Sequence, residues 1–258
     1  MAGTSAAYDP ARGSRQPTPT SRFPGDGESC RAALCSSSGP HAVSDSLSAQ
    51  EYLARGWRVI ATVRGAGRTQ LHGLGEAAGE RLTIERVDIN AVAEVAALHE
   101  RLAGTSVDLL FVNAGITNGD VSVMEVPTET FTDVMVTNAL SPVRFVETFQ
   151  DLVPPSGTIA VMSSRQGSLT MNTTAGYEVY RASKSALNQL MRSFAARHAD
   201  DPRTLLLISP GWVNTELGGP GARLTVDQSV PGIVDTIEKR AGGSGIQFVD
   251  YLNQLLPW

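Results

Sequence analysis

Tyr180 and Lys184 are the residues whose types and spacing most clearly suggest chemistry. They lie four positions apart in the string YRASK, at the start of a segment whose pattern predicts a helix over residues 181–198. Side chains four residues apart share a helix face, so the phenol and the ammonium can converge. A free phenol has a pKa of about 10, and a neighbouring cation favours the phenolate and lowers that pKa. The pair is therefore predicted to exchange a proton with a substrate oxygen.

The segments around this pair predict an α/β fold. Short apolar strands are expected over residues 57–63, 82–87, 107–112, 158–162 and 204–208. Helices are expected over 46–55, around 92–102, over 128–149 with an interruption near Ser141-Pro142, and over 181–198, where Ala182, Ala186, Leu190 and Phe194 form one stripe. Strands that alternate with helices indicate a parallel sheet covered on both faces. We therefore expect a single Rossmann-type, doubly wound domain with its ligand beyond the carboxyl ends of the strands.

Polar motifs follow three of these strands. They are Asn113-Ala114-Gly115, Ser163-Ser164 and Ser209-Pro210-Gly211, the last continuing as PGWVNT. Together with YRASK, and in this order, the motifs resemble those of the short-chain dehydrogenase/reductase family from about Gln50 to Trp258. The strings SSRQGS, YRASKSALN and PGWVNTELGG are most similar to the bacterial C-factor and carbonyl-reductase subgroup.

The resemblance implies an oxidoreductase that moves a hydride between a nicotinamide cofactor and a carbonyl or alcohol substrate. Tyr180 would give a proton to the substrate oxygen or take one from it, and Ser164 would hydrogen-bond that oxygen as it gains charge. Asn138, in MVTNALSP, matches the family's asparagine that holds a water behind the lysine. Two alternatives stay open: Ser163 as the catalytic serine, and Asn138 as an ordinary helix residue. Tyr177, whose partner four residues on is Arg181, is expected to line the substrate pocket or to pack.

Cofactor choice is argued from the end of the strand over 57–63. An NAD enzyme places an acidic residue there to bind the ribose 2′-hydroxyl. Here Val63 occupies that place and Arg64 follows it, which favours NADP. The alternative is that Arg64 is an exposed arginine unrelated to the cofactor. By resemblance, Asp88 and Ile89 lie at the adenine pocket, and Thr215 contacts the cofactor unless it is a helix cap. The complete expected cofactor-binding set is Arg64, Asp88, Ile89, Asn113, Ala114, Gly115, Tyr180, Lys184, Pro210, Gly211, Val213 and Thr215.

The N-terminal region differs from the rest of the chain. Residues 1–46 hold nine serines, five prolines and five glycines, but one leucine, one valine and one phenylalanine. Such a segment is too poor in apolar side chains to offset its ordering entropy. We therefore expect residues 1–33 to be a disordered extension and residues 34–258 to form the domain.

The family's first strand and TGxxxGxG phosphate loop are replaced here by LCSSSGPHAVSDS, residues 34–46. When the codons are read one base early, serines of the TCN type become Phe, Leu, Ile or Val, and suitable third bases give VLIVGASRGIG. We therefore hypothesise that this segment is out of frame, with the frame restored near Gln50; a diverged N-terminus is the alternative. The first strand and glycine-rich loop are then expected to be lost, and the segment to be irregular or to fill the strand position poorly.

Composition narrows the remaining partners and functions. The net charge is −5, so nucleic acid is not an expected partner, and no apolar run is long enough for a bilayer. Cys30 and Cys35 cannot provide the disulfide framework that a domain of this size would need, which favours a reduced cytoplasmic setting. The four histidines do not have the spacing of metal ligands. A homo-oligomer is expected by family resemblance. A non-catalytic cofactor sensor or signalling protein, and a cofactor-binding-defective product of a frame-shifted gene, remain the alternative functions.

Overall fold

The computed structural model describes residues 31–37 and 42–258. Residues 1–30 and 38–41, which include Cys30, most of the expected disordered extension and the expected phosphate-loop position, lie outside the described residues. A single seven-stranded parallel sheet forms the centre, with strand order β3-β2-β1-β4-β5-β6-β7. Its strands are β1 (Ala32–Ser37), β2 (Arg58–Val63), β3 (Leu82–Arg86), β4 (Leu109–Asn113), β5 (Thr158–Met162), β6 (Thr204–Ser209) and β7 (Ile246–Asp250). The order reverses at β1 and β4, as in a doubly wound sheet.

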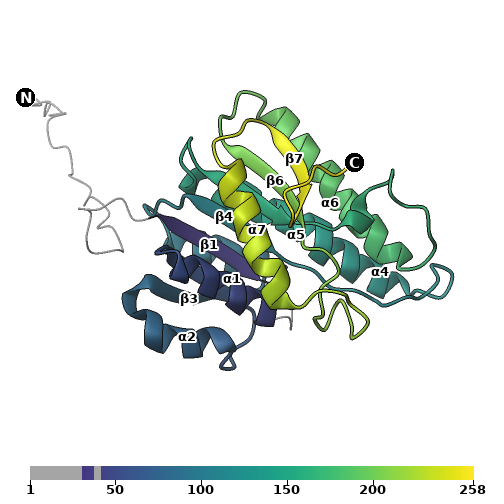
Figure 1. The fold of residues 1–258 in the computed structure, drawn as a ribbon, viewed down its shortest axis with the longest axis horizontal. Helices are drawn as coiled ribbons and strands as arrows, with labels where there is room; N and C mark the ends of the chain where they lie inside the picture. The colour runs from purple at the N-terminus through teal and green to yellow at the C-terminus, as the bar shows by residue number, and fades with distance from the viewer. Residues whose placement is uncertain (1–30, 38–41) are drawn as a thin grey trace, which may run out of the picture.

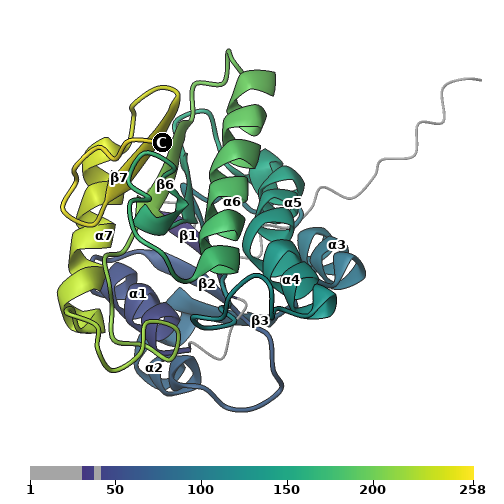
Figure 2. The same cartoon turned by 90° about the vertical axis from the view of Figure 1, so that its right-hand side faces the viewer.

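Helices cover both faces of this sheet. They are α1 (Ala42–Ala54), α2 (Gln70–Ala78), α3 (Val92–Arg101), α4 (Thr128–Met135), α5 (Ser141–Phe149), α6 (Glu178–Arg197) and α7 (Val226–Arg240). Figure 2 shows α1, α2 and α7 on one face and α3, α4, α5 and α6 on the other. An apolar cluster lies on each face of the sheet. One cluster contains Phe145, Phe149 and Phe194, and the other contains Tyr52, Trp57 and Phe111. This confirms the expected Rossmann-type α/β class, with α2, α7 and β7 added to the elements expected from sequence.

The first strand is present, and this corrects the expectation that it would be lost or irregular. β1, the purple strand beside β4 in Figure 1, also pairs with β2. Its Leu34 lies opposite Ile60 of β2 and Leu110 of β4. Ala33 and Leu34 are fully buried, which supplies enough apolar surface for the backbone ladder to form. The fit is imperfect, because the Ser36 hydroxyl is buried without a hydrogen-bond partner among residues 31–37 and 42–258. The strand therefore forms through its backbone despite a polar residue on a buried face.

A π-helical turn joins α4 to α5 where the sequence predicts an interruption. It spans Val136–Leu140, and Pro142 begins the following helix at its first turn. Proline has no N–H, so Pro142 cannot donate to the carbonyl of Asn138 four residues earlier. The helix widens there, and Asn138 is fully buried at its centre.

The buried face of the long helix α6 carries both apolar and polar side chains. Of the stripe Ala182, Ala186, Leu190 and Phe194, Phe194 is buried, Ala186 is half-buried, and Ala182 and Leu190 are exposed. The buried face instead carries Val179, Tyr180, Ser183, Lys184, Leu187, Asn188 and Met191. Ser183, Lys184 and Asn188 among them are polar, so apolar spacing alone does not mark the buried face of α6. In the described residues, no helix is both long and apolar enough to cross a membrane.

Candidate active site

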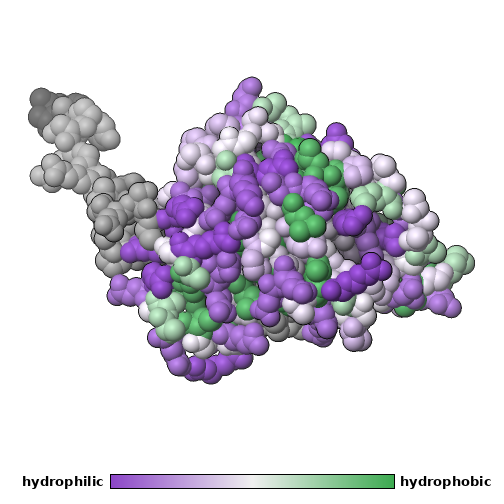
Figure 3. Space-filling view, viewed as in Figure 1, coloured by the Kyte–Doolittle hydropathy of each residue, from purple (hydrophilic) through white to green (hydrophobic). Residues whose placement is uncertain are grey.

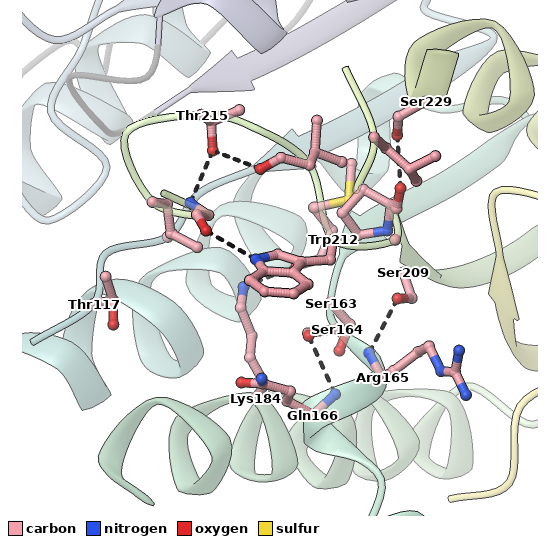
Figure 4. A pocket seen from close by; sticks show the side chains of 18 of the residues that line it. Thr117, Ser163, Ser164, Arg165, Gln166, Lys184, Ser209, Trp212, Thr215 and Ser229 are labelled. Atoms are coloured by element: carbon pink, nitrogen blue, oxygen red, sulfur yellow. Dashed lines mark hydrogen bonds between the residues drawn. The ribbon is translucent and has the colours of Figure 1, made fainter. Parts of the chain in front are cut away.

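A cavity of about 790 Å³ opens at the carboxyl ends of β4, β5 and β6. Most of the expected site residues line it: Asn113, Ala114, Gly115, Ser163, Ser164, Tyr180, Lys184, Pro210, Gly211, Val213 and Thr215. Parallel strands end at the same edge of the sheet, which is why motifs distant in sequence meet here. Figure 4 shows the Lys184 side chain extending from α6 into this cavity.

Lys184 is held at the base of the cavity by two strand-end carbonyls. Its Nζ donates to the carbonyl oxygen of Ala114 at 3.2 Å and to that of Met162 at 3.0 Å. The side chain is 2% exposed, and this burial lowers its pKa to about 8. The carbonyls at the ends of β4 and β5 therefore hold the ammonium at the base of the cavity.

Tyr180 and Ser164 both line the cavity, and their side chains are hydrogen-bonded. Burial raises the pKa of Tyr180 to about 12, and a hydrogen bond with Ser164 works against that rise. This differs from the expectation that Lys184 lowers the pKa of Tyr180. The reason is that desolvation of the phenolate dominates, while the ammonium donates to the two carbonyls. At neutral pH, Tyr180 is therefore a protonated acid.

The two serines of the pair have different surroundings. The Ser163 hydroxyl is buried and donates to Oδ1 of Asn188 at 2.6 Å, so it ties β5 to α6. Ser164 is partly exposed in the cavity, where its hydroxyl accepts from the N–H of Gln166 at 3.2 Å and meets Tyr180. Only the second serine is placed to reach a substrate oxygen beside Tyr180.

Asn138 lies behind the cavity and does not line it. Its side-chain Oδ1 accepts from the N–H of Ile116 at 2.7 Å, and its Nδ2 donates to the carbonyl of Ile116 and to the Ser183 hydroxyl. These bonds tie the π-helical turn to the loop after β4 and to α6. A Cβ added at Gly115 would lie 3.8 Å from Asn138 Oδ1 and 3.5 Å from Lys184 Nζ. Glycine therefore keeps the space beside the lysine open.

The loop after β6 closes the other side of the cavity. Gly211 has φ +83°, and a Cβ there would come within 2.6 Å of Leu224 and 3.0 Å of Tyr251, so only glycine fits. The Thr215 hydroxyl accepts from the N–H of Gly218 at 3.1 Å and caps a turn, not a helix. Thr215 keeps one face toward the cavity, where it can meet a ligand (Figure 4).

Three expected cofactor residues lie outside the cavity. Arg64 is exposed just after β2 and has no hydrogen-bond or ion-pair partner among residues 31–37 and 42–258. Asp88 accepts from the N–H of Asn90 at 2.9 Å, which orders the turn after β3, and Ile89 is buried in the core beside it. All three stand on the β2–β3 side of the switch point, where the adenosine end of a dinucleotide would extend.

Several cavity residues were not identified from the sequence. Trp212 is 52% exposed, and its Nε1 donates to the carbonyl of Gly218 at 2.8 Å. Asp120, Arg181 and Tyr251 also line the cavity. Trp212 lay inside the PGWVNT motif and could have been found from its position there. Asp120 carried no local signal, because its partners come from a segment more than fifty residues away.

The residues present fit a nicotinamide dinucleotide. The cavity reaches from Ser48 on α1 to Tyr180, thus from the helix that follows the first strand to the acid–base pair. Space beside Lys184 is left by Gly115, and polar groups are provided by Thr215 and by the backbone at the strand ends. Arg64 provides a cation on the β2 side of the sheet. The phosphate-loop position, residues 38–41, lies outside the described residues.

A parallel sheet wound on both sides of β1 and β4, with a Ser–Tyr–Lys set at its carboxyl edge, defines a Rossmann-type oxidoreductase. A family model described as enoyl-(acyl carrier protein) reductase matches residues 47–229. The C-signal protein of Myxococcus xanthus is 35% identical over 159 residues, which cover 59% of this chain and 93% of that protein.

Solved structures agree with these sequence matches. A Burkholderia multivorans protein, described as a short-chain dehydrogenase/reductase with bound NADP, is 49% identical with a TM-score of 0.86 and covers 89% of this chain and all of its own. A carbonyl reductase from Pseudomonas aeruginosa PAO1 in complex with NADP is 35% identical with a TM-score of 0.79, over 88% of this chain and all of its own. The chain belongs to the short-chain dehydrogenase/reductase family, and its matches support a hydride-transferring oxidoreductase.

Proposed function

We propose that this protein is an NADP(H)-dependent carbonyl reductase. The observation that carries the proposal is the meeting of Ser164, Tyr180 and Lys184 at one cavity, with the phenol protonated at neutral pH. A protonated phenol suits reduction, because the substrate oxygen needs a proton as it becomes an alcohol. The similar structures with bound NADP, and the unpaired Arg64 in the described part of the chain, support NADP as the cofactor.

Each residue has a distinct task in the proposed reaction. A nicotinamide held in this cavity would supply the hydride for the carbonyl carbon. The Ser164 hydroxyl donates a hydrogen bond to the substrate oxygen and stabilises its developing charge. Tyr180 passes its proton to that oxygen. The Ala114 and Met162 carbonyls hold the Lys184 ammonium at the base of the cavity, and Asn138 fixes the loop and helix between which Lys184 lies.

Steady-state NADPH consumption with a carbonyl substrate tests the proposal. Tyr180→Phe removes the transferable proton and should lower kcat by at least a thousandfold while the melting temperature stays within a few degrees. Ser163→Ala is the matched control, since Ser163 is bonded to Asn188 and not to Tyr180; it should keep most of the activity. Near-normal turnover by Tyr180→Phe would contradict the assignment.

The same assay also tests whether the enzyme prefers NADPH to NADH. The wild type should show a lower KM for NADPH than for NADH, and Arg64→Asp should move the preference toward NADH, because a carboxylate repels the 2′-phosphate and can accept from a ribose hydroxyl. Arg68→Asp, at another exposed cation of the same loop, is the control for a general charge effect. If Arg64→Asp leaves the preference unchanged, Arg64 is not the selector.

A non-catalytic signalling role is the second candidate. It is favoured by the similarity to a protein named C-signal and by the missing glycine-rich motif in the sequence. Calorimetric titration separates the two candidates: binding of NADPH without turnover of any carbonyl compound would favour the sensor, and no binding would favour a cofactor-defective product.

A further inference from the structure

Tyr177 combines strain, exposure and a place in the cavity wall. Its φ of +52° and ψ of +35° are left-handed, and among the described residues Asn253 is the only other non-glycine residue with positive φ. Tyr177 lines the cavity that holds Tyr180, yet its side chain is 37% exposed. Backbone strain of this kind persists only where the surroundings enforce it, and it gathers at functional positions.

Asp120 enforces this conformation from a distant part of the chain. Its Oδ1 accepts from the N–H of Tyr177 at 3.0 Å, so it caps α6 from outside the helix. Gly176, with φ +93°, lies so close that a Cβ there would come within 2.8 Å of the same oxygen. A negative charge at a helix N-terminus is favourable, which adds to the hydrogen bond.

A second bond joins the same two segments. Oε2 of Glu178 accepts from the N–H of Val123 at 2.8 Å, so the loop after β4 and the start of α6 are tied at two points. The Arg181 guanidinium also bonds Asn172 and Thr174, which orders the stretch before Tyr177. The position of Tyr177 is thus fixed from both sides, only three residues before Tyr180.

A second exposed aromatic ring lines the same cavity. Trp212 is 52% exposed and is held through its Nε1, as Figure 4 shows. Covering a large aromatic side chain with a flat or apolar group is favourable in free energy, because it buries a large apolar surface. Two such rings, each fixed by a hydrogen bond or a strained backbone, favour a substrate that covers them.

We propose that Tyr177 determines substrate specificity, that Asp120 is its positioning residue, and that the substrates are carbonyl compounds bearing a planar aromatic group. This inference rests on the proposed reductase function. Tyr177 and Trp212 receive the aromatic group while the carbonyl oxygen lies at Ser164 and Tyr180. Asp120 acts through the backbone of Tyr177 and does not touch the substrate.

The test compares benzaldehyde with cyclohexanecarbaldehyde, which has a ring of similar size that is not planar. The readout is the ratio of their kcat/KM values with NADPH, measured on the full chain. Tyr177→Gly should lower the aromatic-to-saturated ratio at least tenfold, while its glycine relieves the strain and keeps the melting temperature from falling. Tyr177→Phe keeps the ring and should keep the ratio.

Variants of Asp120 test its positioning role in the same assay. Asp120→Asn retains an acceptor oxygen and should keep the ratio, whereas Asp120→Ala should lower it. Asn253→Gly removes the other left-handed non-glycine residue outside the cavity and should leave the ratio unchanged. Equal ratios in Tyr177→Gly and Tyr177→Phe would overturn the inference while the reductase proposal stands. No NADPH consumption by the wild type with either aldehyde would overturn the reductase proposal, and the inference with it.

Discussion

At the scale of single residues, burial decides how the acid–base pair behaves. Tyr180 is 8% exposed and Lys184 is 2% exposed, and removal from water disfavours the charged form of each. The pKa of Tyr180 therefore rises to about 12, and that of Lys184 falls to about 8. A neutral phenol beside a lysine poised near neutral pH suits proton delivery to a substrate oxygen. An apolar side chain would be easier to bury than a lysine, and this supports the proposal that Lys184 is kept for function.

The lowered pKa of Lys184 predicts a pH-dependent stability. Its folded-state pKa of about 8 lies below the ordinary value of 10.5, so the unfolded state binds more protons between these values. Stability is thus reduced at pH 7 and recovers as the pH rises from 8 toward 10.5. Between pH 7 and pH 9.5, the free energy of unfolding of the wild type should increase by about 2 kcal/mol relative to that of Lys184→Met. Urea denaturation of both proteins measures this; a constant difference would show that the lysine is not buried as described.

At the scale of secondary-structure elements, β1 shows how a backbone ladder tolerates an unsuitable sequence. Its neighbours β2 and β4 supply hydrogen bonds on both sides, and Leu34 packs in the core. In the described part of the chain, the Ser36 hydroxyl is nevertheless buried without a hydrogen-bond partner. The family resemblance predicts an apolar side chain in this strand. A change of reading frame at this segment stays a prediction, which resequencing of the DNA encoding residues 30–52 would check.

Removal of the unpaired hydroxyl should stabilise the protein. Ser36→Ala deletes a buried group that lacks a partner, so the free energy of unfolding should rise by about 1–2 kcal/mol. Ser163→Ala is the matched comparison, because that buried serine donates to Asn188, and its removal should lower stability by about 1 kcal/mol. Chemical denaturation gives both values. A loss of stability in Ser36→Ala would show that the hydroxyl has a partner after all.

Replacement of the whole segment tests its effect on the cofactor. Residues 34–45 replaced by VVLIVGASRGIG should raise stability, by roughly 1.5–3 kcal/mol for each large apolar side chain that becomes fully buried. The new glycines would also let backbone N–H groups reach a pyrophosphate at the start of α1. Melting scans of both chains with and without NADPH measure the two effects. If NADPH stabilises the original chain equally, its N-terminus is a working divergent solution.

At the scale of the whole molecule, the surface carries an apolar site apart from the cavity. The face in Figure 3 is mostly hydrophilic with small separate hydrophobic areas. Leu140 and Leu190 are 37% and 38% exposed and line a shallow hollow of about 310 Å³ between α5 and α6, with Val143 at its base. The Glu147–Arg197 ion pair borders this hollow. A second copy of the chain could cover the exposed Leu140 and Leu190 side chains in this hollow.

We expect the protein to form a homo-oligomer through this α5–α6 face. Leu190→Arg places a charge where an apolar contact is expected, so it should shift the assembly toward monomer in light scattering coupled to size exclusion. Leu169→Arg, at an exposed leucine outside this face, should leave the oligomeric state unchanged. A wild type that is monomeric at micromolar concentration would contradict the prediction.

The sequence by itself determined the fold class, most of the strands, and the residues that meet at their carboxyl ends. Those features are local, since strand periodicity, the NAG, SS and YxxxK motifs and the proline after Asn138 each leave a signal within a few residues. The tertiary structure alone decided which serine faces Tyr180, which face of α6 is buried, and how burial shifts the two pKa values. It also decided that β1 forms and that Asp120 holds Tyr177. These outcomes depend on contacts between distant segments, and the free energy of burial is set by those contacts.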